Sequence, residues 1–187
     1  MSHVQIVGLS ELKQYLGITN EDEDGPLTAI MQAANDAVEK ACDRTFKSTV
    51  YTDEVYDGTG TSELILKHYP VTVLSVVKYG EASPFTTVAS ADYGFTSEGI
   101  ITLLYGGIFD KIARYWRITY TAGYADAVMP SDLKWATTEI GVFFYKMKSR
   151  LGITSKTVAG QVVESYLANF PAHVQDILDR HKRKVLY

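Results

Sequence analysis

The residue types that could carry out chemistry in this sequence are few and scattered. The four histidines are His3, His68, His173 and His181. None of them falls into an H-x-x-x-H or H-E-x-x-H spacing, which would place two metal ligands on one face of a helix. The G-x-S-x-G, Walker and G-x-G-x-x-G motifs are also missing from the sequence. We therefore expect no catalytic residue, no metal and no cofactor.

Two groups of acidic residues could still supply carboxylates to a site. Asp53, Glu54 and Asp57 lie close together in the sequence, and a glycosidase needs two such groups as acid and base. With no companion motif, a polar strand face and a turn explain them better. The consecutive acids at 21–24 lack the central glycine and closing glutamate of a calcium loop. We expect a solvated turn beside a helix N-terminus there.

Cys42 is the only cysteine, which excludes an intramolecular disulfide and a cluster of thiolate metal ligands. A reducing compartment is the natural interpretation. Cys42 stands at the end of an apolar periodic stretch, and a free cysteine in such a place is usually a small buried hydrophobe. We expect a core residue without reactivity.

Composition and charge exclude several classes of protein. Hydrophobic residues make up 46% of the 187 residues and charged residues 21%, as in an ordinary globular domain. The net charge of −4 lacks the excess of Lys and Arg with which nucleic-acid-binding domains displace counterions from phosphates. No stretch approaches the length of apolar sequence that crosses a bilayer, so we expect no membrane partner.

The elements that must position these residues change in type twice along the chain. Residues 9–46 carry a short helix begun by Ser10 and stopped by Gly17, then an amphipathic helix over 27–44. Residues 47–123 contain about six short β-branched and aromatic runs separated by turn signals. The connections are too short for crossover helices, which predicts an antiparallel sheet or a small barrel.

Helical periodicity returns over 131–184. A helix from Ser131 is apolar on more than one face, so it either packs between the sheet and the 27–44 helix or forms a subunit interface. Residues 149–165 are small and polar with two glycines and are expected to form a loop. A last helix begins near Pro171. The basic run after it either complements the negative pole of that helix or docks on an acidic partner.

These patterns predict a single α+β domain over residues 1–187. Its helical body of about four helices comprises 9–46 and 131–184, and the inserted antiparallel sheet or small barrel comprises 47–123. At the junction, Gly123 lets the chain leave the last strand and Pro130 restricts the preceding residue to extended geometry. Ser131 or Asp132 can then satisfy the free amides of the next helix.

Short motifs in a fixed order carry a resemblance to a known family. The first is L-x-x-Y-L-G at 12–17. A Cys-x-Arg-x-Phe-like element follows at Cys42, Arg44 and Phe46. A strand motif is met by Leu64, Leu66, Pro70, Val71 and Leu74, the last replacing a valine. The pattern V-x-Y-x-A-G-Y…P-x-D-L-x-x-A is matched by Ile118, Tyr120, Ala122, Gly123, Tyr124, Pro130, Asp132, Leu133 and Ala136.

Taken together, the sequence resembles the head-tail connector (adaptor, or head-completion) proteins of long-tailed bacteriophages. Matching pieces run from about Leu9 to Lys184, although 80–115 and 149–165 carry no residue-by-residue match. The resemblance implies a structural virion protein without catalysis. It joins the capsid portal to the tail at the head-tail junction, and it is in the host cytoplasm before assembly.

The resemblance also implies a set of partners. A homo-oligomeric ring, typically of twelve copies, would bind the portal protein and offer a surface to a tail-side stopper or tail-completion protein. DNA would pass through its channel without specific binding. A ring requires two different patches on each copy. The candidate partner residues are Tyr124, Trp135, Phe144, Ile177, Arg180, Arg183 and Lys184.

Two alternatives from other classes stay open. A small hydrolase would need a deep pocket with convergent polar groups. A carbohydrate-binding β module would use some of the thirteen tyrosines and two tryptophans to line an exposed groove. We expect Tyr124 and Trp135 instead to pack at the sheet-to-helix junction or against a neighbouring subunit.

Overall fold

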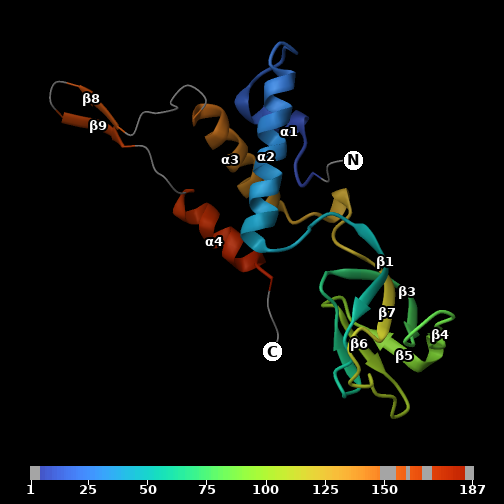
Figure 1. Cartoon of the computed structure of the whole chain (residues 1–187). Helices are drawn as coiled ribbons and strands as arrows, with labels where there is room; N and C mark the ends of the chain where they lie inside the picture. The colour runs from blue at the N-terminus through green and yellow to red at the C-terminus, as the bar shows by residue number, and fades with distance from the viewer. Residues whose placement is uncertain (1–4, 148–154, 159–160, 166–169, 184–187) are drawn as a thin grey trace. The chain divides into compact units, whose positions relative to one another are not determined.

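The computed structural model describes residues 5–147, 155–158, 161–165 and 170–183. The chain divides into two compact units (Figure 1). The helical unit comprises Met1–Arg44 and Met129–Tyr187, and the β unit comprises Thr45–Val128. The described α-helices lie in the helical unit, and the four-stranded and three-stranded antiparallel sheets lie in the β unit, so the predicted α+β class is confirmed.

Four helices form the described core of the helical unit: α1 (Leu9–Leu16), α2 (Asp24–Cys42), α3 (Ser131–Met147) and α4 (Ala172–His181). The prediction that Ser10 caps α1 is wrong. Gly8 holds the N-cap position, and its backbone N–H donates to the Glu11 carboxylate at 3.1 Å. A bond from the N-cap backbone N–H to a glutamate at the third helical position is one half of a capping box. Gly17 ends α1 with a φ of 71°, as predicted.

The acidic run before α2 begins that helix three residues earlier than the apolar periodicity predicts. Asp24 is the first helical residue, and Leu27 donates its backbone N–H to the Glu23 carbonyl at 2.9 Å. Negative charge is favourable at this end of a helix. Asp24 also pairs with Lys13 of α1 at 2.6 Å, so one of the four acids links two helices.

Helix α3 packs against α1, α2 and α4, which confirms its predicted contact with the 27–44 helix. At the α3–α4 contact, His181 Nε2 lies 3.0 Å from an Asp132 carboxylate oxygen. Cys42 is buried as predicted, and burial raises the pKa of its thiol to about 11. The apolar core of this unit includes Leu12, Leu27, Met31, Val38, Leu133, Ala136, Ile140 and Val174.

The β unit contains seven described strands instead of about six, all paired antiparallel. One sheet has the order β1-β7-β3-β4, formed by Thr49–Tyr56, Trp116–Ala122, Val71–Tyr79 and Thr86–Thr87. The other has the order β2-β6-β5, formed by Glu63–Ile65, Ile100–Leu103 and Tyr93–Phe95. Three of these strands, β2, β4 and β5, are only two or three residues long, which explains why sequence runs undercount them.

One shared hydrophobic cluster holds the strands of the β unit together. Its buried members include Tyr56, Leu64, Val77, Ile101, Phe109, Trp116, Ile118 and Tyr120. Strand β7 alternates buried and half-buried residues along its whole length, the pattern of a central strand with one face on the core. The two sheets of this unit therefore bury a common set of side chains.

Gly123 ends β7 for the reason expected from the sequence. Its φ is 104°, and a Cβ there would lie 2.4 Å from the Lys47 carbonyl oxygen. Only glycine tolerates both the dihedral and the close approach. Further on, α3 begins at Ser131, and Asp132 accepts a hydrogen bond from the backbone N–H of Leu133 at 2.8 Å.

The prediction of a loop over 149–165 is wrong for its described part. Strand β8 (Ser155–Val158) pairs antiparallel with β9 (Gln161–Ser165), with Val158 opposite Gln161. Residues 149–154 and 159–160 lie outside the described residues. The missed signal is the β-branched residues on both sides of an Ala-Gly pair, which is typical of a hairpin.

No helix among the described residues is both long and apolar enough to span a membrane.

Candidate interaction surfaces

The loop between β6 and β7 exposes a cluster of large apolar residues. Leu104, Tyr105, Ile108 and Ile112 are all exposed within nine residues of sequence. Single exposed hydrophobic residues are ordinary on a soluble protein, whereas a local cluster indicates a contact surface. We call residues 104–112 the apolar loop.

Tyr105 owes its exposure to the turn that opens the apolar loop. The backbone N–H of Gly107 donates to the Leu104 carbonyl at 3.0 Å. The φ values of 53° at Tyr105 and 79° at Gly106 are those of a type I′ turn. A left-handed conformation costs an ordinary L-residue about 1–2 kcal/mol, and Tyr105 is 88% exposed, so burial does not offset that cost. An unfavourable conformation combined with full exposure makes Tyr105 a candidate contact residue.

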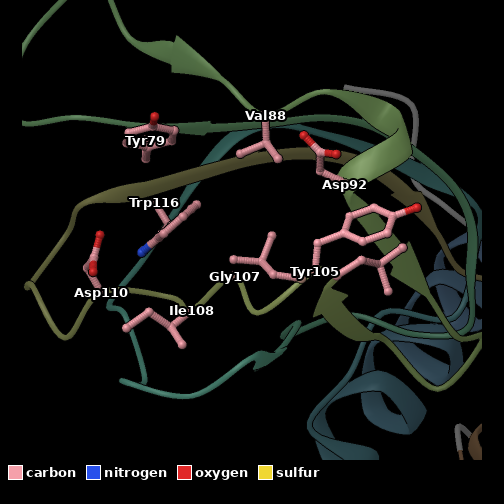
Figure 2. A pocket seen from close by; sticks show the side chains of 10 residues that line it. Tyr79, Val88, Asp92, Tyr105, Gly107, Ile108, Asp110 and Trp116 are labelled. Atoms are coloured by element: carbon pink, nitrogen blue, oxygen red, sulfur yellow. The ribbon is translucent and has the colours of Figure 1, made fainter.

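A cavity of about 440 Å³ lies beside the apolar loop. Tyr79 and Trp116 supply aromatic walls, and Val88 and Ile108 supply aliphatic ones. Two carboxylates, Asp92 and Asp110, also line it, and Figure 2 shows them at different sides of the cavity. The volume falls within the range of ~300–1,000 Å³ that is usual for binding sites. The cavity therefore combines an apolar lining with negative charge.

Among the residues that line the cavity, Trp116 is the most buried one with a polar atom in its side chain. Its side chain is 3% exposed and packs edge-on against Phe109, with ring centroids 4.7 Å apart. Within the part of the chain that the structure describes, its buried indole Nε1–H has no hydrogen-bond partner. Figure 2 shows this nitrogen on the edge of the ring directed toward Asp110 and Ile108. A buried donor without an acceptor costs free energy. The indole N–H of Trp116 is such a donor within the described residues.

The strongest electrostatic cluster of the β unit surrounds Glu54. Oxygen Oε2 accepts hydrogen bonds from the hydroxyls of Tyr56 at 2.6 Å and Tyr120 at 2.5 Å. Oxygen Oε1 lies 3.7 Å from His68 Nε2 and 3.5 Å from Lys67 Nζ. Burial by itself would raise the pKa of the Glu54 carboxyl. The contact with His68, the hydrogen bonds from Tyr120 and Tyr56 and the charge of Lys67 overcome this and lower the pKa to about 2.

The two tyrosines of this cluster shift in the opposite direction. Burial and the hydrogen bond to Glu54 raise the pKa of both Tyr56 and Tyr120, because a negative neighbour disfavours a phenolate. At neutral pH the cluster therefore holds one carboxylate and two hydroxyl donors. The hydrogen bond from Tyr120 to Glu54 braces β7 against β1.

The other two acids of the predicted group have partners of their own. Asp53 pairs with Lys78 at 3.1 Å, and Asp57 accepts a hydrogen bond from the backbone N–H of Arg114 at 2.7 Å. These contacts agree with a polar strand face and a turn. Among the described residues, no group of three or more His, Cys, Asp or Glu side chains could hold a metal ion.

A second apolar surface lies on the helical unit. Trp135 on α3 is 44% exposed, and its ring lies 5.1 Å from the ring of His173 on α4. His173 Nε2 is 2.5 Å from a carboxylate oxygen of Glu139. Further along α3, the ring centroid of the half-buried Phe144 lies 6.0 Å from that of Phe170. We call Trp135 and His173 the aromatic α3 surface.

The remaining predicted partner residues are dispersed. Tyr124 belongs to the β unit, where its backbone bridges to Lys47 and its side chain is half-buried. Ile177 is 4% exposed and belongs to the helical core. Arg180 is exposed beside Asp176 at 3.8 Å. Arg183 donates its backbone N–H to the Cys42 carbonyl at 2.8 Å, and Lys184 lies outside the described residues.

The structure thus places Trp135, Phe144, Arg180 and Arg183 on the helical unit and Tyr124 on the β unit. Sequence reasoning missed the apolar loop and its cavity. The available signal was the run Leu103–Ile108, in which apolar residues continue across a pair of glycines, since loops are otherwise polar.

Comparison with known protein families decides the class of this chain. The family model described as head completion protein matches residues 5–184. The chain belongs to the head completion protein family. This membership confirms the resemblance to bacteriophage head-tail connectors, and it gives the chain a structural role at the head-tail junction. No curated protein matches the chain.

Solved structures of gene transfer agent (GTA) particles contain chains with the same fold. A chain in the neck of the empty GTA particle, computed with sixfold symmetry, has a TM-score of 0.67 at 18% identity. That match covers 97% of this chain and 92% of the other. A chain in the virion of the native particle has a TM-score of 0.61 at 18% identity, with the same coverage of both chains. A chain in the neck of the native particle, computed with twelvefold symmetry, has a TM-score of 0.59 at 18% identity and is covered to 90%, with 95% of this chain matched.

Proposed function

We propose that this head completion protein forms a ring in the virion between the portal protein and a tail-side stopper or tail-completion protein. The family match over residues 5–184 carries the proposal. The shared fold with neck chains of GTA particles supports it. The twelvefold symmetry of one of those necks supports twelve copies.

The two apolar surfaces suit such an arrangement. A closed ring is built from heterologous contacts, in which each copy offers two different patches. The apolar loop of the β unit and the aromatic α3 surface of the helical unit are two chemically distinct patches on separate units. We assign contacts with neighbouring copies and with the portal and tail-side proteins to these two surfaces.

In the proposed ring, DNA passes through the channel without specific binding. Each copy carries a net charge of −4, and a ring of such copies repels phosphates at long range. A channel lined without excess Lys and Arg lets DNA pass with little binding. The proposed function needs no reaction, since the work is done by shape and by contacts between proteins.

The first test is genetic. Deleting the gene should leave DNA-filled heads and separate tails, and supplying the wild-type protein in trans should restore tailed particles. An antibody label on the restored protein should appear at one capsid vertex in negative-stain images. Tailed, infectious particles in the deletion strain would contradict the proposed function.

The second test is an assembly measurement with a matched control. Mixing the 20.8 kDa chain with its portal should add about 250 kDa if twelve copies bind. Trp135→Ala should reduce that added mass, whereas Tyr15→Ala, which truncates another exposed aromatic residue on α1, should not. An unchanged melting temperature in both variants would show that the difference lies in assembly. Equal assembly by both variants would remove the aromatic α3 surface from the proposal.

A further inference from the structure

The β unit carries both a cavity with two carboxylates and an exposed segment with two cations. The segment is Lys-Ile-Ala-Arg at residues 111–114, which we call the basic segment. We propose that the basic segment of one copy docks in the cavity of the next copy around the ring. This inference rests on the proposed ring and names one of its contacts between copies.

Asp92 and Asp110 define the charge that the cavity would take. Both residues line the cavity, and Figure 2 shows them at different sides of it. Both are exposed, and neither is paired with a cation in the part of the chain that the structure describes. Because the two carboxylates lie apart, a ligand with two separate cations matches them better than a ligand with one.

The rest of the lining defines the polarity of the occupant. Tyr79, Val88 and Ile108 supply aromatic and aliphatic walls, so apolar side chains lose water by entering. The volume of about 440 Å³ has room for more than one side chain. The cavity therefore suits a peptide in which apolar residues stand between two cations.

Trp116 adds a demand for a hydrogen-bond acceptor. Its side chain is 3% exposed, and its indole Nε1–H has no partner within the described residues. The nitrogen is directed toward two other wall residues, Asp110 and Ile108 (Figure 2). An entering peptide brings backbone carbonyls, and one carbonyl would satisfy the buried donor. A purely hydrocarbon occupant would leave it unsatisfied.

The basic segment has the matching composition. Its two cations, Lys111 and Arg114, flank Ile112 and Ala113. All four residues are exposed, and neither cation is paired with a carboxylate among the described residues. The carbonyl oxygens of Lys111 and Ala113 accept no hydrogen bond from those residues either. Each of them is therefore available to the indole N–H in the next copy.

The spacing of the two cations suits carboxylates that lie apart. Lys111 and Arg114 stand three residues apart, so their Cα atoms are separated by at most about 11 Å. Both side chains are long and place their charge several bonds from the backbone. The ammonium and the guanidinium can thus reach different sides of the cavity while the residues between them face its walls.

A neighbouring turn holds the basic segment in shape before it docks. The backbone N–H of Gly58 donates to the Ile112 carbonyl at 3.0 Å, and that of Arg114 donates to the Asp57 carboxylate at 2.7 Å. Arg114 has a φ of 54°, a left-handed conformation that is unfavourable for an ordinary residue. A segment that is already ordered loses less conformational freedom on binding.

A second copy is the occupant that these observations favour. Each copy of a cyclic ring contacts its neighbours through two unlike patches that fit each other. The cavity and the basic segment form such a pair, since one offers two carboxylates and the other offers two cations. Every copy carries both halves, so the contact repeats around the ring without any other protein.

Photocrosslinking in assembled particles tests the inference. Ala113 is replaced by benzoylphenylalanine, and isotopically heavy and light copies are mixed before assembly on the portal. We expect heavy–light crosslinks from position 113 to wall residues such as Val88 or Trp116. We also expect a ladder of crosslinked trimers and longer chains, because each copy in a ring docks on the next.

Three crosslinking results would overturn the inference. The first is crosslinks within one chain only, and the second is crosslinks only to the portal or to a tail-side protein. The third is heavy–light dimers without longer products, because two copies that dock reciprocally use up both halves of the contact and cannot form a ring.

Charge exchange gives a second measurement. Lys111→Glu with Arg114→Glu reverses the basic segment, and Asp92→Lys with Asp110→Lys reverses the cavity. Each reversed chain alone should form heavy–light crosslinks at a yield about tenfold lower, because like charges then meet. An equimolar mixture of the two reversed chains should restore the yield, since every contact in an alternating ring again joins opposite charges.

Two controls accompany the charge exchange. Lys111→Arg with Arg114→Lys keeps both charges and should give a yield close to that of wild type. All the substituted side chains are exposed, so the melting temperature of each separate chain should match wild type. Equal yields in all variants, or no restoration in the mixture of folded chains, would refute the docking.

Particle assembly separates this inference from the proposed function. If the chain with the reversed basic segment gives tailed particles in normal yield, the docking is overturned and the ring stands. If that chain stays folded and monomeric, and the mixture with the reversed cavity restores the ring, the docking is supported. Absence of the wild-type protein from the head-tail junction removes the ring and the docking together.

Discussion

Glu54→Gln should destabilise the β unit by about 3 kcal/mol at pH 7. In the folded protein the Glu54 carboxylate accepts hydrogen bonds from Tyr56 and Tyr120 and lies near His68 and Lys67. Burial raises the pKa of this carboxyl, but these partners outweigh burial and bring it from 4.5 to about 2. One pKa unit corresponds to 1.36 kcal/mol, which leads to the figure of about 3 kcal/mol.

The sign of the pH dependence follows from the same two values. A carboxyl whose pKa is lower in the folded than in the unfolded state stabilises the protein above the unfolded value of 4.5. This stabilisation is lost as the pH falls from 4.5 toward 2. At pH 3 about 1.5 kcal/mol of the contribution of Glu54 should remain. The difference between wild type and Glu54→Gln should therefore shrink by about half between pH 7 and pH 3.

The assay is urea denaturation of the full chain, followed by tyrosine fluorescence and near-ultraviolet circular dichroism at both pH values. Other carboxylates titrate in both proteins, so the difference between them isolates Glu54. Glu63→Gln, at an exposed carboxylate of the same unit, serves as the control and should change the free energy of unfolding by less than about 0.5 kcal/mol. If Glu54→Gln matches the control at pH 7, or if its difference from wild type does not shrink at pH 3, the hydrogen-bonded cluster does not stabilise the fold as reasoned here.

Three further outcomes are expected. Gly58→Ala should lower the melting temperature sharply, because its Cβ would lie 1.6 Å from the Asp110 carbonyl oxygen and the apolar loop would have to move; a melting temperature like that of wild type would contradict this packing. Tyr105→Asn should raise the free energy of unfolding by about 0.5–1 kcal/mol, because an Asn-Gly pair suits a type I′ turn, while it lowers the yield of tailed particles; normal particle yield would argue against a contact role for this residue. Cys42 should resist a thiol reagent at pH 8 until urea is added, because burial raises its pKa to about 11; rapid labelling of the native protein would show that the thiol is accessible.

Much of the architecture was predictable because it depends on local pattern. Helical periodicity predicted α2, α3 and α4. The succession of short β-branched runs separated by turn residues predicted an antiparallel insertion. Gly123 was predictable as a turn because only glycine suits its conformation. Where local signals compete, as at Ser10 or in the 149–165 stretch, the sequence prediction was wrong.

The sequence by itself determined the class of the molecule: an α+β chain without a recognisable catalytic motif, with its one cysteine in the core and with the motif order of a head completion protein. Only the tertiary structure decided which side chains meet. A bulge in β1 between Tyr51 and Glu54 sets the register that brings Glu54 to Tyr120, and a shift of one residue would turn it to the other face. The cavity likewise gathers Tyr79, Asp92 and Trp116 from distant segments. Such groupings arise from long-range strand pairing, which no local pattern of residues encodes.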